Sequence, residues 1–164
     1  MGKEIERKFL IKKEKINFEK LNAINIKQGY IAKTEEKTVV RVRTTETEET
    51  KIGYITIKGK NKGSIRDEFE YIIPYNEAKE MLNKFCKKKI EKTRYILIEE
   101  TNPNHKWEID VFKGDNEGLI IAEIELKDER EKINIPNWIE KEVTNNSKYY
   151  NSNLLEQGIK NGNI

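Results

Sequence analysis

The chain has 164 residues, of which 37% are charged and 35% hydrophobic, and its formal net charge is only +3. This length favours one domain with its own core, spanning residues 1–164, and the near balance of charges excludes a bulk polycation. One cysteine, Cys86, excludes an internal disulfide framework, and no apolar run approaches the roughly 20 residues of a membrane-spanning helix. We therefore expect a cytoplasmic protein.

The first stretch, Gly2–Ile11, alternates between polar and apolar side chains. Successive side chains of a β-strand point to opposite faces, so this alternation predicts a strand. Its polar face carries Glu4, Glu6 and Lys8, which are two carboxylates and an ammonium, and its other face is apolar. The same arrangement returns in strand after strand.

Seven further strands are predicted from the same alternation. Their expected bounds are residues 25–32, 38–47, 52–58, 64–73, 91–100, 105–113 and 119–127. Glycine, proline and asparagine mark turns at 59–63, 101–104 and 114–118, and residues 45–51 form an acidic, threonine-rich hairpin tip.

A helix is predicted over residues 76–89, because apolar residues recur there at the spacing of one buried stripe. The stripe comprises Ala78, Met81, Leu82, Phe85 and Cys86. Asn76 suits the N-cap, and the three lysines at 87–89 suit the negative end of the helix dipole. Shorter helical turns are expected within 12–23 and 153–158, and a short strand at 142–144.

The polar faces of the predicted strands carry almost only charged residues. The acids are Glu4, Glu6, Glu68, Glu70, Glu108, Asp110, Glu123 and Glu125. The bases are Lys8, Arg41, Arg43, Lys58, Arg66, Lys92 and Arg94. A solvated sheet face would explain any one strand, but such faces usually mix in threonine, serine and glutamine. The recurrence favours a face that meets a charged ligand.

Closing about eight strands into a barrel would remove the exposed sheet edges and turn the charged faces inward. Charges buried there would be costly without a charged ligand. Arginine binds phosphate through two parallel hydrogen bonds, and carboxylates are suitable ligands for Mg²⁺ or Mn²⁺. The pattern therefore indicates a polyphosphate and divalent metal ions.

Other chemistry has little support in the sequence. There is no cysteine and histidine cluster for zinc, no phosphate-binding P-loop and no nucleophile paired with a base. The only histidine, His105, falls at an expected turn, where we expect an exposed bystander. A nucleic-acid binder would need exposed bases with stacking aromatic residues, whereas these bases alternate with acids.

The ordered set of motifs resembles the CYTH superfamily, the triphosphate tunnel metalloenzymes, and the similarity covers nearly the whole chain. Its start is the Glu-x-Glu-x-Lys of Glu4, Glu6 and Lys8. The further motifs are Gln-Gly-Tyr from Gln28, Val-Arg-Val-Arg from Val40, Thr-Ile-Lys-Gly-Lys from Thr56, Arg-Asp-Glu-Phe-Glu from Arg66, Glu-Lys-Thr-Arg-Tyr from Glu91, Trp-Glu-Ile-Asp-Val-Phe from Trp107, Ala-Glu-Ile-Glu-Leu from Ala122 and Tyr-Asn-Ser-Asn-Leu from Tyr150.

The resemblance implies a mainly β fold with flanking helices, in which eight antiparallel strands form a closed β-barrel with a charged interior. The implied metal ligands are Glu4, Glu6, Asp110, Glu123 and Glu125, with Glu108 as a further contributor. The implied phosphate contacts are Lys8, Arg41, Arg43, Lys58, Arg66, Lys92 and Arg94. Glu68 and Glu70 would orient the bases, the attacking water or a metal, and join Glu4, Glu6 and Lys8 as catalytic residues. Lys148 would reach the substrate from a C-terminal segment that plugs one mouth.

The implied activity is metal-dependent hydrolysis of inorganic tripolyphosphate to orthophosphate and pyrophosphate, by attack of a metal-activated water. The compact chain and its Glu-Ile-Glu-Arg-Lys-Phe-Leu start look most like the short bacterial tripolyphosphatases. The alternatives are a class IV adenylyl cyclase, a nucleoside or thiamine triphosphatase, and a polyphosphate-binding module without turnover. The preferred metal and the oligomeric state stay open.

Overall fold

The computed structural model describes residues 2–33, 38–60, 65–99 and 102–158, with the side chains of 2–4, 32–33 and 65–66 left out. This part of the chain forms nine strands: β1 (Gly2–Ile11), β2 (Ala23–Lys33), β3 (Val39–Glu46), β4 (Lys51–Lys58), β5 (Ile65–Ile73), β6 (Ile90–Glu99), β7 (Asn102–Phe112), β8 (Ile120–Glu125) and β9 (Ile139–Glu142). Two helices are present, α1 (Tyr75–Phe85) and α2 (Asn151–Gln157), with short 3₁₀ turns at Lys13–Lys15, Phe18–Lys20, Gly114–Asn116 and Ser147–Tyr149.

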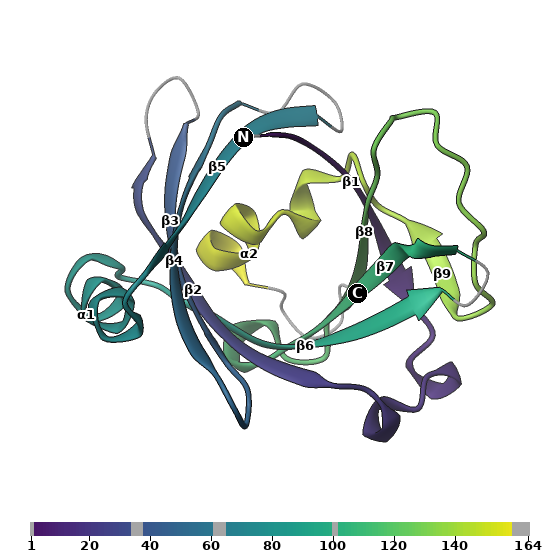
Figure 1. Ribbon diagram of the computed structural model, residues 1–164, viewed down its shortest axis with the longest axis horizontal. Coiled ribbons are helices and arrows are strands. Elements are labelled where there is room, and N and C mark those ends of the chain that lie inside the picture. The colour runs from purple at the N-terminus through teal and green to yellow at the C-terminus, as the bar shows by residue number, and fades with distance from the viewer. Residues whose placement is uncertain (1, 34–37, 61–64, 100–101, 159–164) are drawn as a thin grey trace.

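The strands form one antiparallel sheet in the order β5-β4-β3-β2-β6-β7-β8-β1-β9. β1 also pairs with β5, where Gly2 to Ile5 lie opposite Glu68 to Ile65. Figure 1 shows the strands curving around a central space, with α2 seen inside the curve and α1 outside it. The fold is thus mainly antiparallel β with two helices, as the sequence predicts. No helix in the described residues is long and apolar enough to cross a membrane.

The apolar faces of the strands are covered from outside. The largest cluster brings the buried Phe9, Trp107 and Ile124 against Trp138 and Phe18, which lie in the segments around the sheet. The Trp107 ring packs edge-on against both Phe9 and Trp138, with centroids 5.5 and 5.1 Å apart. This covering frees the opposite faces of the same strands to carry charge.

A second cluster lies under α1, where Ala78, Leu82 and Cys86 pack on Val42. Two glycines permit this close approach. A Cβ at Gly53 would lie 2.7 Å from the Ala78 Cβ, and one at Gly29 would lie 2.6 Å from the Cys86 Cβ. Neither distance is sterically tolerable. A third cluster, containing Phe112, Ile121, Tyr149 and Leu154, joins α2 to the strands.

The predicted helix is too long at its end. Asn76 is not its cap, because α1 starts at Tyr75 after Pro74, and Cys86 is already extended, so the lysines at 87–89 lie beyond the helix. The buried stripe is confirmed for Ala78, Leu82 and Cys86 but wrong for Phe85, which is 58% exposed. Leu82 and Cys86 take the packed side of the last turn, and Phe85 points away from this cluster.

The strand predictions hold with small shifts. β1 has the expected bounds, whereas residues 102–104, expected in a turn, open β7, where Asn102 pairs with Glu99. The short C-terminal strand lies a little earlier, at Ile139–Glu142, and the last helix starts at Asn151. Most of the turn expected at 59–63 lies outside the described residues.

His105 is not the exposed bystander that its place in the sequence indicates. Its side chain is buried between two carboxylates: Nδ1 lies 2.9 Å from Glu99 Oε2 and Nε2 lies 3.0 Å from Glu131 Oε1. Glu99 ends β6, and Glu131 lies in the segment between β8 and β9. His105 therefore ties that segment to the sheet.

This contact predicts a pH-dependent stability. Hydrogen bonding to Glu131 raises the pKa of His105, burial opposes the rise, and Glu99 adds to it. The free energy by which protonated His105 stabilises the fold is complete below the ordinary histidine pKa of about 6.5. It is lost as pH rises through the higher pKa of His105 in the folded protein. The gap in Tm between wild type and His105→Gln should therefore be largest near pH 6 and shrink towards pH 9 in thermal unfolding. A gap that stays constant over this range would contradict the expectation.

Candidate active site

The strand register places the charged residues of neighbouring strands side by side on the inner face. Lys8 on β1 lies opposite Glu123 on β8, which in turn lies opposite Glu108 on β7. Across the next pairing, Asp110 on β7 lies opposite Arg94 on β6. The wall formed by β3, β4 and β5 repeats the pattern with Arg41, Thr56 and Glu70, and with Lys58 and Glu68.

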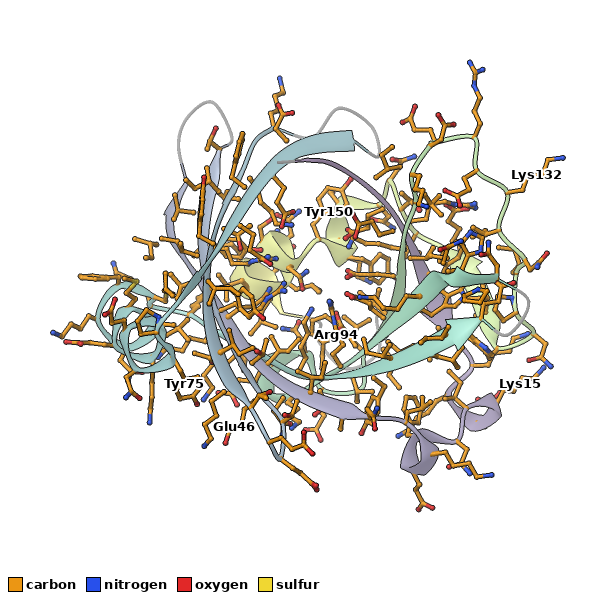
Figure 2. All side chains as sticks on the ribbon, in the orientation of Figure 1. Lys15, Glu46, Tyr75, Arg94, Lys132 and Tyr150 are labelled. Atoms are coloured by element: carbon orange, nitrogen blue, oxygen red, sulfur yellow. The ribbon has the colours of Figure 1, made fainter. Side chains whose placement is uncertain are left out.

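These residues surround a cavity of about 410 Å³. Ten of the predicted site residues line it: Glu6, Arg41, Arg43, Lys58, Glu68, Glu70, Arg94, Glu108, Glu123 and Glu125. Figure 2 shows Arg94 inside the curve of the strands, whereas Lys15 and Lys132 lie on the periphery. The alternation in the sequence therefore does sort the charged residues towards one shared space.

The remaining predicted residues are placed differently. Lys92 and Asp110 are completely buried beside the cavity rather than on its lining. The side chains of Glu4 and Arg66 lie outside the described part, although their backbones pair with each other. Lys148 is exposed, with its ammonium over the Tyr149 ring, and it is not among the described residues of the lining.

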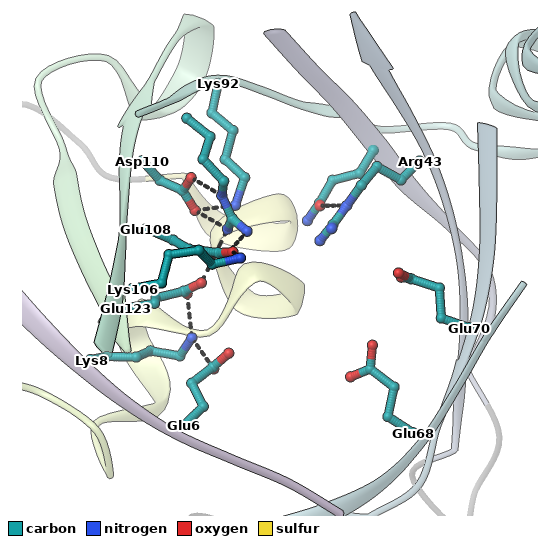
Figure 3. A network of polar contacts seen from close by, with 12 residues as sticks. Glu6, Lys8, Arg43, Glu68, Glu70, Lys92, Lys106, Glu108, Asp110 and Glu123 are labelled. Carbon is teal, nitrogen blue, oxygen red and sulfur yellow. Dashed lines mark hydrogen bonds and ion pairs between the residues drawn. The ribbon is translucent and has the colours of Figure 1, made fainter. Parts of the chain in front are cut away.

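One side of the cavity is a buried network centred on Asp110 (Figure 3). Arg94 donates from Nε and from one terminal nitrogen to the two oxygens of Asp110, each at 2.7 Å, and Lys92 also donates to this carboxylate. Arg94 further contacts Glu108 and, at 3.2 Å, Glu123. Both oxygens of Asp110 are thus engaged by bases.

The network continues from Glu123 through Lys8 to Glu6, because the Lys8 ammonium contacts both carboxylates. Burial would lower the pKa of Lys8, but Glu123 and Glu6 outweigh it and raise that pKa. Burial likewise would raise the pKa of Glu123, yet Lys8, Lys92 and Arg94 hold it well below its usual range. Lys8 and Glu123 are therefore charged at neutral pH.

The facing wall holds a second network. Arg41 donates to Thr56 Oγ1 at 3.1 Å and to Glu70 Oε2 at 3.0 Å, and the Thr56 hydroxyl donates to the same Glu70 oxygen at 2.7 Å. Lys58 lies 2.5 Å from Glu68. Burial acts to raise the pKa of Glu70, but the Thr56 hydrogen bond and the nearby arginines lower it overall. Glu70 is thus a carboxylate at neutral pH.

Arg43 differs from the other bases of the cavity. Figure 3 shows it reaching inward opposite Asp110 and Lys92. Its Nε donates to the neutral Gln28 Oε1 at 3.2 Å, and no carboxylate among the described residues forms an ion pair with it. Burial, together with Arg41 and Arg94, lowers its pKa to about 10. Glu70 and Asp110 oppose this lowering through charge alone, without an ion pair. Arg43 therefore faces the cavity without a direct carboxylate partner among the described residues.

The acids offer oxygen ligands of the kind that Mg²⁺ and Mn²⁺ prefer. In the described part of the chain, however, they are not gathered into a group of three or more that could hold a metal ion. Lys8 already sits between Glu6 and Glu123. The donor set fits a divalent cation in its chemistry, with Lys8 holding two of the carboxylates together.

Several polar residues of the site were given no role by the sequence analysis: Thr56, Gln28 and Asn151, and also Asn104, Lys106, Lys127 and Glu131 on the lining. Thr56 lies two residues from Lys58 on β4 and opposite Arg41, and Gln28 lies opposite Arg43. The alternation could therefore have placed both on the inner face. Asn151 lines the cavity from the start of α2, and its buried Oδ1 has no partner among the described residues. Only its place in the Tyr150 motif singled it out.

Comparison with known proteins identifies the family. The model of the CYTH domain matches residues 2–157. The chain belongs to the CYTH family. A protein of Acetivibrio thermocellus named inorganic triphosphatase is 44% identical over 162 residues, which is 98% of each chain. A Nitrosomonas europaea protein of the same name is 29% identical over 153 residues, or 92% of this chain and 95% of the relative.

A solved structure agrees with the fold. The crystal structure of an inorganic triphosphatase superposes with a TM-score of 0.64 at 27% identity, covering 92% of this chain and 96% of the other. The CYTH architecture therefore extends over nearly the whole described chain.

The buried network predicts a large cost for removing its central charge. Asp110→Asn keeps the shape of the side chain but leaves Lys92 and Arg94 facing a neutral amide. Breaking a buried pair in this way typically costs about 3–5 kcal/mol. Urea unfolding should show this loss, whereas Asp115→Asn, at an exposed acid, should change stability little. Equal stabilities of the two variants would contradict a structural role for Asp110.

Proposed function

We propose that this CYTH-family chain hydrolyses inorganic triphosphate to orthophosphate and pyrophosphate. The observation that carries the proposal is the guanidinium of Arg43, which has no carboxylate at ion-pair distance among the described residues and faces a cavity that other bases and carboxylates line. Burial is the main cause of the lowered pKa of Arg43, and repulsion by the nearby guanidinium groups of Arg41 and Arg94 adds to it. A polyphosphate would relieve this repulsion. The names of the two relatives support this choice of substrate.

The cavity is proposed to be a closed tunnel of eight strands, β1 to β8. The pairing of β1 with β5 supports this, because these strands stand at opposite ends of the eight-strand series. A closed tunnel would exclude bulk water, which strengthens every charge interaction inside it. Because all these strands belong to one sheet, residues 1–164 are proposed to form one domain.

The bases are proposed to act at two depths. Arg41, Arg43, Lys58 and Arg94 line the cavity and would donate hydrogen bonds to phosphate oxygens. Lys8 and Lys92 lie behind them and would contribute through their charge. Arg66 joins the set through its strand position opposite Glu4. Converging cations would stabilise the charge that spreads over the transferred phosphoryl group.

A divalent metal ion, Mg²⁺ or Mn²⁺, is proposed to bind at Glu6, Glu123 and Glu125, with Glu4 on the same strand face as Glu6. When bound, it would neutralise phosphate oxygens and lower the pKa of a water. Asp110 is better assigned as a positioning residue, because it is completely buried off the lining, with its oxygens accepting hydrogen bonds from Arg94 and Lys92, whereas Glu6, Glu123 and Glu125 line the cavity.

Glu70 and Glu68 are proposed to orient the reacting groups from the opposite wall. Glu70 accepts hydrogen bonds from Arg41 and Thr56, which hold its carboxylate at the cavity. An ionised carboxylate held in this way can accept a hydrogen bond from a water and direct it at the terminal phosphorus. Glu68 similarly holds Lys58.

The proposal is tested by measuring phosphate release from tripolyphosphate, ATP and thiamine triphosphate, each with Mg²⁺, with Mn²⁺ and with EDTA. We expect metal-dependent release from tripolyphosphate and little from the other two. Cyclic nucleotide and pyrophosphate from ATP would instead identify a cyclase. Binding of tripolyphosphate without turnover would identify a binding module and overturn the proposed hydrolysis.

The metal assignment predicts the effect of single carboxylate replacements. Glu6→Gln keeps the size of the side chain but removes a charged ligand, and turnover should fall about 100-fold or more, the scale of losing one charge-stabilising group. Glu123→Gln should behave alike. The exposed Glu48→Gln on the hairpin tip is the matched control.

The readout is the initial rate over a Mg²⁺ titration, with circular dichroism to check the fold. Wild-type rates and wild-type metal dependence in both folded variants would remove these residues from the ligand set.

A further inference from the structure

Gln28 is a fully buried amide on β2, at 0% exposure. The register places it opposite Arg43, and its Oε1 accepts the hydrogen bond from Arg43 Nε. Its Nε2 is also buried and has no hydrogen-bond partner among the described residues. An unpartnered buried donor costs free energy, so the fold alone gives no reason for an amide here.

A glutamate at the same position would serve the fold better. It would pair its charge with Arg43 and leave no orphan N–H group. The buried bases on the lining have such partners: Arg41 contacts Glu70, Lys58 contacts Glu68, and Arg94 contacts Glu108. Gln28 orients the Arg43 guanidinium through Nε without neutralising it. The neutral partner is thus unfavourable for folding and favourable for binding an anion.

We propose that Gln28 is a positioning residue for phosphate binding, which holds Arg43 in place while keeping its charge available. The inference rests on the proposed function and refines it, because it assigns the selectivity of the cavity for anions to one neutral side chain. It also implies a trade-off, in which stability is lost at residue 28 to keep an anion site open.

The trade-off makes Gln28→Glu an informative variant. The new carboxylate would pair with Arg43, so Tm should stay equal or rise by about 2–4 °C, the scale for a domain of this size. Tripolyphosphate binding, measured by calorimetry with EDTA present, should weaken at least tenfold. Gln157→Glu, at the other glutamine of the chain, is the matched control and should change binding less than twofold.

Two further variants separate positioning from a merely structural role. In an Arg43→Ala background, Gln28→Glu should lower Tm, because the carboxylate then has no partner at that position. Gln28→Met keeps the charge of Arg43 but removes its acceptor, and it should weaken binding less than Gln28→Glu does.

The inference is overturned if folded Gln28→Glu binds tripolyphosphate like wild type, if Gln28→Glu lowers Tm equally with and without Arg43, or if Gln28→Met binds as tightly as wild type. These outcomes differ from failure of the proposed function, in which wild type itself would not bind or hydrolyse tripolyphosphate.

Discussion

The structure depends on one electrostatic constraint: charges that face inward must be compensated. A carboxylate or ammonium removed from water is stable only beside a partner of opposite sign. The inner face meets this requirement with two networks on facing walls, one centred on Asp110 and the other on Glu70. The outward faces of the same strands are apolar and must be covered in turn, which explains α1 and the packing of Trp138.

Compensation within each wall has a consequence for ligand binding. Lys8 lies between Glu6 and Glu123 and supplies the positive charge that these acids need. The cavity walls can therefore fold without relying on a ligand. Arg43 differs from the buried bases of the lining, because it has no carboxylate at ion-pair distance among the described residues, and this is where we propose that an anion binds. On this proposal, anion binding and carboxylate positioning come from different residues of one surface.

The sequence was sufficient to predict which face each charged residue occupies, because alternation along a strand is a local property. It could not distinguish Arg41 from Arg43, which lie on the same face of the same strand. Their difference lies in the register, which sets Thr56 and Glu70 near one and Gln28 beside the other. His105 was misjudged for the same reason, since Glu131 reaches it from a distant segment without regular structure. Such contacts between distant segments produce no periodic pattern in the sequence.

Depth along the strand was equally hidden from the sequence, and it decides which acids can meet a ligand. Along β7 the side-chain exposure rises from 0% at Asp110 to 25% at Glu108 and 54% at Lys106. β8 shows the same gradient, with Glu123 buried and Glu125 exposed. Asp110, which lies off the lining, is held by Arg94 and Lys92, whereas Glu123 and Glu125 reach the lining of the cavity. Alternation treats these acids as equivalent, and the metal role of Asp110 came from the family resemblance, whereas the depth of its strand position favours a positioning role.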